Sequence, residues 1–235
     1  MKKMMTHSNQ KESSLKVFFS YFWPLTRKID TDYNGLLFLT LFKGRKILNS
    51  EHANYSFGAL QQILEVGLSK INFENINSIL VLGLGGGSVV FSLREKFKYE
   101  GKIVAVELDQ KLIDIARDEF SIVSTNNLTI HNNDAFEFIK KCKNPFDLII
   151  VDLFIDNVVP EKFYSEEFCQ NLSNAVSQKG SILYNLGIHQ MDQEKRNSVI
   201  HFFKNREEYK TSQNEKVGGT NFLLIAEKNI QYESI

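Results

Sequence analysis

The sequence predicts an α/β fold in which a mostly parallel sheet, covered by helices on both faces, follows a small antiparallel β region. Short continuous apolar runs alternate with amphipathic stretches of helical spacing, and such runs suit strands that are buried on both faces. Near the C-terminus the alternation gives way to two strand-like runs around a Gly218-Gly219 turn, which indicates an antiparallel hairpin at the sheet edge.

The N-terminal region predicts a small β meander. Residues 1–15 are polar and are expected to form a flexible tail. Three strand-like runs follow at 25–33, 36–42 and 45–49, separated by Asn34-Gly35 and Lys43-Gly44. Asn and Gly tolerate the positive φ angles of tight turns, so a meander is expected over residues 16–50. Its many aromatic side chains could form the surface of a homodimer.

Residues 51–235 are expected to form one main domain. It begins with a helix over 56–71, where the apolar positions recur at helical spacing. Strands are then expected at 79–84, 103–108, 128–131, 148–151 and 181–186, with helices at 89–97, 110–120, 135–141, 161–176 and 192–205. The hairpin of 207–212 and 221–227 completes a sheet of seven strands.

Composition argues against several classes of partner. Lys+Arg and Asp+Glu are equal at 28 each, which removes the broad electrostatic case for nucleic acid or an anionic membrane. No run approaches the roughly 20 apolar residues of a membrane span, and the apolar stretch at 17–22 is too short and too late for a signal peptide. We expect a cytoplasmic protein with a small-molecule partner. Cys142 and Cys169 are expected to be buried thiols, not metal ligands.

A glycine loop after the first buried strand carries the strongest functional signal. It reads Gly83-Leu-Gly-Gly-Gly-Ser88, and Glu107 ends the next strand. Glycines let the backbone approach a ligand closely, and an acid at that strand end can accept hydrogen bonds from both hydroxyls of a ribose. The pair predicts an adenosine nucleoside site. A dinucleotide site is less favoured, because Ser88 stands where G-x-G-x-x-G requires its third glycine.

Further acids follow the next two strands. Asn133-Asp134-Ala135 comes after the third strand, where an Asp is placed to meet the adenine amino group. Asp152 ends the fourth strand and would face the reaction centre, since open α/β sheets bind ligands outside the carboxyl ends of their strands. Asp109 is expected to act mainly as the cap of the helix that begins at Gln110.

The order of these motifs resembles that of spermidine synthases and spermidine synthase-like methyltransferases. GLGGGS, VELD, NNDAFEFI, FDLIIVDLF and VPEKFYSEEFCQNL stand in sequence, and the resemblance covers residues 35–187. It implies the Rossmann-like class I methyltransferase fold and, as cofactor, S-adenosylmethionine or decarboxylated S-adenosylmethionine. By this resemblance the cofactor-binding residues are Gly83, Gly85, Gly86, Gly87, Glu107, Asp134, Ala135 and Asp152, and the catalytic residues are Asp152 and Asp156.

Three departures from the polyamine enzymes guide the functional expectation. Ser88 stands where spermidine synthases place an Asp, Ser56-Phe57 stands where they place a Tyr-His pair, and apolar residues fill the acceptor loop from Asp152 to Asp156. An apolar wall would leave the ammonium groups of a diamine unpaired. We therefore expect a methyltransferase that acts on a small-molecule acceptor, by orienting its reactants, with Asp156 as the base.

Three alternatives stay open at this point. The first is a polyamine aminopropyltransferase that uses decarboxylated S-adenosylmethionine. The second is a non-catalytic module that binds an adenosine nucleoside, suggested by the altered acceptor loop. The third is an NAD-dependent oxidoreductase, which Ser88 and the terminal hairpin disfavour.

Overall fold

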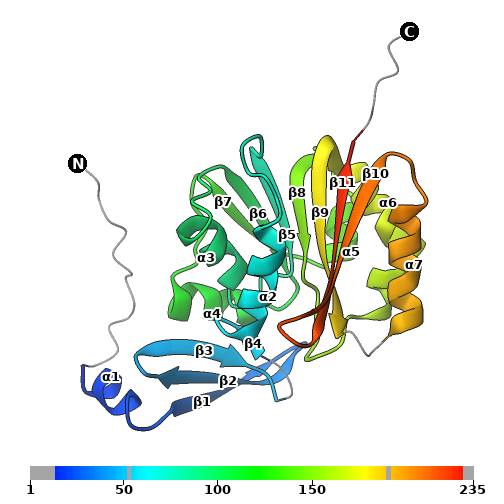
Figure 1. Ribbon diagram of the computed structural model, residues 1–235. Coiled ribbons are helices and arrows are strands. Elements are labelled where there is room, and N and C mark those ends of the chain that lie inside the picture. The colour runs from blue at the N-terminus through cyan, green and yellow to red at the C-terminus, as the bar shows by residue number, and fades with distance from the viewer. Residues whose placement is uncertain (1–13, 52–53, 189–191, 230–235) are drawn as a thin grey trace.

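Two sheets organise the chain in the computed structural model, which describes residues 14–51, 54–188 and 192–229 (Figure 1). The strands of the larger sheet are β5 (Ser78–Leu82), β6 (Lys102–Glu107), β7 (Leu128–Asn132), β8 (Phe146–Val151), β9 (Val176–Ile188), β10 (Tyr209–Val217) and β11 (Asn221–Lys228). They lie in the order β10-β11-β9-β8-β5-β6-β7. β5 to β9 pair in parallel, whereas β11 and β10 pair antiparallel at one edge. The predicted Rossmann-like fold is confirmed.

The strand order fixes where a ligand can enter. From β5 the chain adds β6 and β7 on one side, then returns to add β8 and β9 on the other side. At such a switch point the connections after the neighbouring strands β5 and β8 run in opposite directions, and a crevice opens at the carboxyl ends of the strands. The loops after β5 and β8 flank that crevice.

Helices cover both faces of the larger sheet (Figure 1). The helices are α2 (Ala59–Leu68), α3 (Ser88–Glu95), α4 (Gln110–Phe120), α5 (Ala135–Lys140), α6 (Glu166–Ala175) and α7 (Gln193–Lys204). Successive residues of β5 point to opposite faces of the sheet. Ile79 packs in a core with residues of α2 and α3, and Leu80 packs in a core with residues of α5, α6 and α7. A fully buried Leu or Ile contributes about 1.5–3 kcal/mol, so this two-sided burial explains the continuous apolar runs.

Two of the predicted elements have different bounds. The helix expected over 161–176 is a 3-10 turn, η1 (Glu161–Tyr164), followed by α6. Ser165 separates them, because its extended backbone ends the turn and its Oγ accepts the N–H of Phe168 as the cap of α6. β9 is longer than the expected 181–186, because it already pairs with β8 at Val176.

The smaller sheet lies against one end of the larger domain (Figure 1). Its strands, in order, are β1 (Leu25–Thr31), β2 (Gly35–Phe42), β3 (Arg45–Asn49) and β4 (Asn54–Ser56). The first three correspond to the predicted meander, and β4 extends the sheet past residue 50. Leu37 and Leu48 are fully buried against Leu112 of α4. The division into domains stays a prediction.

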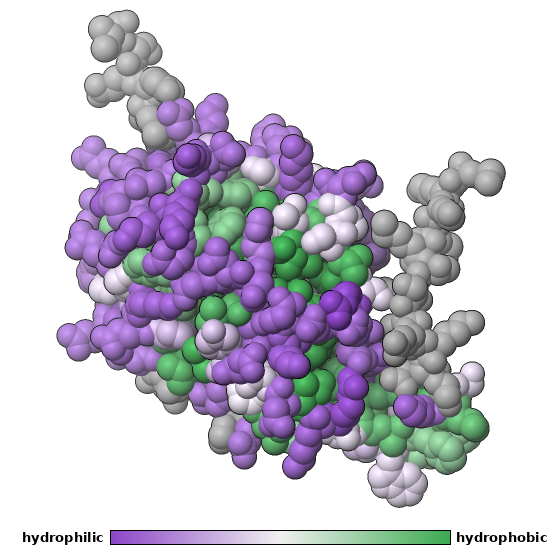
Figure 2. Space-filling view, turned by 180° about the vertical axis from the view of Figure 1, so that it is seen from behind, coloured by the Kyte–Doolittle hydropathy of each residue, from purple (hydrophilic) through white to green (hydrophobic). Residues whose placement is uncertain are grey.

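A helix, α1 (Ser14–Ser20), precedes the smaller sheet and begins inside the stretch expected as a tail, whose first 13 residues lie outside the described structure. Phe18, Phe22 and Trp23 are 58%, 62% and 73% exposed, and Figure 2 shows apolar surface at this end of the molecule. The homodimer stays a prediction.

Cys169 is buried as expected, whereas Cys142 is half-buried in the turn after α5. In the described ranges, no helix is long and apolar enough to cross a membrane.

Candidate functional site

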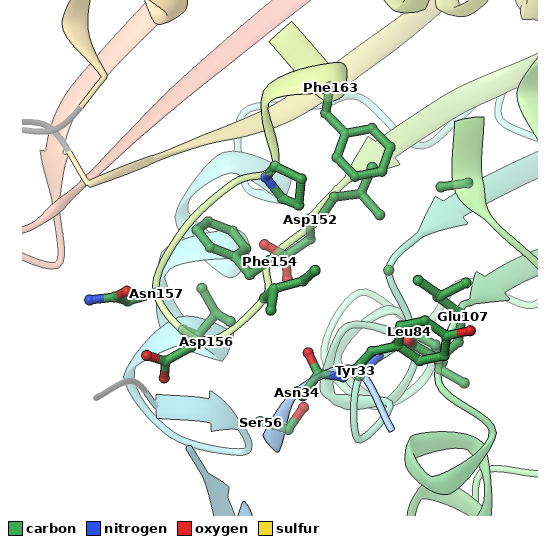
Figure 3. Close-up of a pocket in the computed structure, with 18 of the residues that line it drawn as sticks. Tyr33, Asn34, Ser56, Leu84, Glu107, Asp152, Phe154, Asp156, Asn157 and Phe163 are labelled. Carbon is green, nitrogen blue, oxygen red and sulfur yellow. The ribbon is translucent and has the colours of Figure 1, made fainter. Parts of the chain in front are cut away.

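A cavity of about 320 Å³ opens at the carboxyl ends of β5, β6 and β8 (Figure 3). Its floor comes from the glycine loop and from the acids that end or follow the strands. Tyr33 and Asn34, from the β1–β2 turn, and Ser56, from β4, form a second wall. Tyr33 and Asn34 were not among the predicted site residues, because no local pattern shows that the smaller sheet closes over the larger one.

The glycine loop is held close to the next strands. Gly83 has φ +92°, and a Cβ atom at this position would lie 2.1 Å from the carbonyl oxygen of Asp152, so a larger residue cannot fit. Gly85 donates its N–H to Glu107 Oε2 at 2.8 Å. Both glycines line the cavity, so the loop after β5 offers backbone to a ligand.

The other two glycines of the loop do not appear among the cavity-lining residues. Gly86 donates its N–H to Ser56 Oγ at 2.9 Å. Gly87 caps α3 with φ +88°, and a Cβ there would meet Ile122. Both positions thus have packing reasons to be glycine. Contact of Gly86 or Gly87 with a cofactor stays a prediction.

Glu107 ends β6 and is 8% exposed. Besides the bond from Gly85, its Oε1 accepts the N–H of Asp109 at 3.0 Å. Burial raises the pKa of Glu107, while these N–H donors act in the opposite direction. Each carboxylate oxygen keeps a further lone pair, so ribose hydroxyls are a chemically suitable ligand. Glu107 also holds the glycine loop in place, a role that the sequence analysis did not include.

Asp109 does more than cap a helix. Its Oδ1 accepts the N–H of Lys111 at the start of α4, at 3.0 Å, as expected. Its Oδ2 accepts hydrogen bonds from Asn34 Nδ2 at 3.0 Å and from the N–H of Tyr33 at 3.3 Å. The fully buried Asp109 side chain therefore ties the cavity wall of the smaller sheet to the larger domain.

Asp134 lines the cavity at the start of α5. Its Oδ1 accepts the N–H of Phe136 at 2.8 Å as a helix cap, and its Oδ2 forms an ion pair with Lys162 of η1. Burial opposes ionisation, but the ion pair and the N–H donors outweigh it and lower the pKa of Asp134. Ala135, also at the cavity, is the first residue of α5. A contact of Asp134 with adenine stays a prediction, and Lys162 was not foreseen.

Asp152 follows β8 directly and lines the cavity beside Gly83. Its Oδ1 accepts a hydrogen bond from Asn185 Nδ2 of β9 at 2.9 Å. Burial raises the pKa of Asp152 to about 7, the nearby charge of Glu107 acts in the same direction, and the bond from Asn185 opposes the rise. A carboxyl group with this pKa can accept a proton near neutral pH.

Asp156 stands at the tip of a tight turn in the loop after β8. Ile155 and Val158 exchange backbone hydrogen bonds of 2.9 and 3.1 Å, which closes the turn, and Asp156 has φ +54°. Its Oδ1 accepts the hydroxyl hydrogen of Ser50 at 2.5 Å. Asp152, Phe154 and Asp156 follow one another along the cavity (Figure 3). The structure thus places both predicted catalytic acids at one cavity, with apolar side chains between them.

The charge of the cavity is predominantly negative. Among the described residues that line it, Glu107, Asp134, Asp152 and Asp156 are acidic, and Lys162 is the one basic residue. Because Lys162 pairs with Asp134, the remaining acids favour a cationic ligand. The described part of the chain contains no group of three His, Cys, Asp or Glu side chains that could hold a metal ion.

The comparisons with known proteins agree with this arrangement. The model of the spermine/spermidine synthase domain matches residues 58–212. A polyamine aminopropyltransferase of Alkaliphilus metalliredigens (strain QYMF) is 33% identical over 116 residues, which are 46% of this chain and 39% of that relative. The match therefore spans less than half of the relative's length.

Solved structures share the fold. A probable spermidine synthase from Corynebacterium glutamicum ATCC 13032 has a TM-score of 0.63 at 18% identity, and the match covers 90% of this chain and 80% of that one. Human methyltransferase-like protein 13 in complex with SAH has a TM-score of 0.59 at 22% identity, with 75% of this chain and 84% of that one covered. At such identities the likeness shows the fold alone.

These findings correct the main functional expectation of the sequence analysis. The family model is that of spermine and spermidine synthases and the curated relative is a polyamine aminopropyltransferase, so the expectation of a methyltransferase is wrong and its aminopropyltransferase alternative is favoured. The expected resemblance to spermidine synthases is confirmed. Since the family model matches more than half of the sequence, the chain belongs to the spermine/spermidine synthase domain family.

Proposed function

We propose that this protein is an aminopropyltransferase that moves the aminopropyl group of decarboxylated S-adenosylmethionine to a small amine. The observation that carries the proposal is the cavity itself, in which acids surround an apolar stretch and Asp152 has a pKa of about 7. Both substrates of this reaction are cationic, because the donor has a sulfonium and a primary ammonium and the acceptor has ammonium groups. Membership of the family supports the same reaction.

The residues of the cavity suit the adenosine part of the donor. Gly83 and Gly85 bring the backbone of the loop to the cavity, and Glu107 offers lone pairs to the ribose hydroxyls. Asp134 and Ala135 are the proposed contacts for adenine. A negatively charged site also suits a sulfonium donor that carries no carboxylate.

The acceptor loop suits a diamine better than its composition suggests. Leu153, Phe154 and Ile155 line the cavity between Asp152 and Asp156. A diamine has charged ends and an apolar middle, so its methylene chain can pack on these side chains while its ammonium groups meet the two acids. Pairing of the ammonium groups removes the desolvation penalty on which the methyltransferase expectation rested.

The proposed chemistry is a displacement at carbon. The lone pair of the acceptor nitrogen forms a C–N bond to the propyl carbon, while the C–S bond breaks and its electron pair returns to sulfur, which leaves a neutral thioether. The acceptor must first lose a proton from its ammonium group, and Asp152 is the proposed base. Asp156 is the proposed partner of the distant ammonium group. Positioning of the two reactants supplies much of the remaining rate gain.

Binding of two donors to the purified protein tests the proposal. Decarboxylated S-adenosylmethionine is expected to bind at least about tenfold more tightly than S-adenosylmethionine in calorimetry, because the carboxylate of the latter would meet an acidic cavity. Glu137→Gln changes an exposed side chain in the first turn of α5 that does not line the cavity, so it serves as control and should leave both affinities unchanged. Tighter binding of the carboxylated donor would contradict the proposal.

A further inference from the structure

A line of hydrogen-bonded polar side chains leads from Asp152 to Thr220. Except for Asp152, its members have no proposed part in catalysis. Asn185 of β9 donates to Asp152, and Asn221 of β11 donates from Nδ2 to Asn185 Oδ1 at 3.0 Å. Thr220 then donates from its hydroxyl to Asn221 Oδ1 at 2.8 Å. Asn185 is fully buried and Asn221 is 7% exposed, although amide side chains are usually exposed.

The direction of this line is fixed by the backbone. Gly187 donates its N–H to Asn185 Oδ1 at 3.3 Å, and a backbone N–H can only donate. The oxygen of the Asn185 amide must therefore face Gly187 and Asn221, and its NH₂ group must face Asp152. Each amide in the line accepts on one side and donates on the other, so every bond is polarised toward the Asp152 carboxylate.

A bulge in the sheet produces this geometry. Between the pairs Asn221–Ile188 and Leu223–Asn185, β9 advances by three residues while β11 advances by two. Gly187 lies in the bulge with φ +85°, a conformation that favours glycine. Bulges beside active sites often redirect side chains, and this one leaves the N–H of Gly187 available to Asn185.

We infer that Asn185 and Asn221 are positioning residues that hold the Asp152 carboxyl group with Oδ1 turned to the sheet and that favour its ionised form. Asn185 donates a hydrogen bond to Asp152 directly. Asn221 acts through Asn185, because its hydrogen bond to Asn185 Oδ1 keeps the amide of Asn185 from flipping. The antiparallel hairpin at the sheet edge therefore influences the proposed base, because Asn221 belongs to its strand β11. The inference rests on the proposed function, since Asp152 needs this control only if it accepts a proton.

Other charged groups share the cavity with Asp152 and must stay unchanged in a test. They are Glu107 of β6, Asp134 at the start of α5, Lys162 of η1 and Asp156 of the acceptor loop. Glu107 raises the pKa of Asp152, whereas a hydrogen bond from Asn185 lowers it. Loss of the Asn185 amide must therefore move the titration of Asp152 to higher pH.

The test is a pH titration of the whole chain without substrates, in which NMR monitors the ¹³C-labelled carboxyl groups of the Asp residues. The Asp152→Asn variant assigns the signal of Asp152. Asn185→Ala is expected to raise the Asp152 midpoint by about one to two pH units, the shift that corresponds to one hydrogen bond to a charged group. Asn221→Ala is expected to shift it in the same direction by less. Asn214→Ala, an Asn of the same hairpin that lies outside the line, is the matched control and should leave the midpoint unchanged.

Each outcome decides the inference independently of the reaction. An unchanged midpoint in both Asn185→Ala and Asn221→Ala would overturn it, even in an enzyme that transfers aminopropyl groups. If Asn185→Ala does not fold, Asn221→Ala at the cavity rim carries the test alone, and an unchanged midpoint there overturns the role of the line. The expected shifts in a protein without transferase activity would support the positioning role and contradict the proposed function. In an active enzyme, the acid limb of kcat/KM should move with the midpoint, and Asn185→Gln should restore part of the shift.

Discussion

At the scale of single residues, Glu107 combines a structural role with its proposed contact to ribose. Its two carboxylate oxygens accept the N–H groups of Gly85 and Asp109, so the acid shapes the loop that a nucleoside would touch. Local sequence shows an acid at a strand end. It does not show that the same acid folds back onto the glycine loop.

Glu107→Ala is expected to weaken binding of decarboxylated S-adenosylmethionine at least about tenfold, since a hydrogen bond to a charged group is worth about 1.5–3 kcal/mol. The same change leaves two backbone N–H groups without their acceptor and should lower the free energy of unfolding by about 1–3 kcal/mol. Glu107→Gln, which keeps an oxygen acceptor, should lose less of both. Calorimetry and urea unfolding measure the two effects, and wild-type affinity in folded Glu107→Ala would refute the ribose assignment.

Asp152 should make the protein less stable as the pH rises. Its pKa is raised from 3.8 to about 7 in the folded state, so the folded protein holds this proton more tightly than the unfolded chain does. Stability is therefore lost progressively between about pH 4 and pH 7. Asp152→Asn removes the effect, and its advantage in free energy of unfolding over wild type should grow by roughly 2–3 kcal/mol between pH 5 and pH 8. An advantage that does not change with pH in urea unfolding would contradict the raised pKa.

At the scale of elements, the contact between the two sheets depends on Asp109. Asp109→Ala removes both the cap of α4 and the buried bonds to Asn34 and Tyr33, and should cost about 2–4 kcal/mol in free energy of unfolding. Asn34→Ala keeps the cap and should cost less. A loss near zero in Asn34→Ala, together with a loss of only about 1 kcal/mol in Asp109→Ala, the worth of the cap alone, would show that the link between the sheets contributes nothing.

Most strands and helices could be predicted because their signals are local. Alternating packing on two faces makes β5, β6, β8 and the central part of β9 read as apolar runs, and α4 has the predicted bounds. Elements that depend on distant partners were missed. β4 forms because it pairs with β3, and the break at Ser165 depends on a cap that a helical pattern alone does not show.

At the scale of the whole molecule, parallel topology made part of the site predictable. Glu107, Asp134 and Asp152 lie at or just beyond the carboxyl ends of three parallel strands of one sheet, so they meet at one rim. Asn185 and Asn221 escaped prediction because the bulge at Gly187 brings them together across β9 and β11. The expectation of a methyltransferase gave the apolar residues of the acceptor loop more weight than the acids at its two ends, which line the same cavity.

The central claim is aminopropyl transfer, and product analysis tests it most directly. The purified protein is incubated with decarboxylated S-adenosylmethionine and diamines of three to five carbons, and in parallel with S-adenosylmethionine, and the products are identified by mass spectrometry. We predict an aminopropylated diamine together with an equal amount of methylthioadenosine, and loss of both products at neutral pH in Asp152→Asn. Absence of an aminopropylated product with every diamine, in a folded protein that binds the donor, would contradict the account.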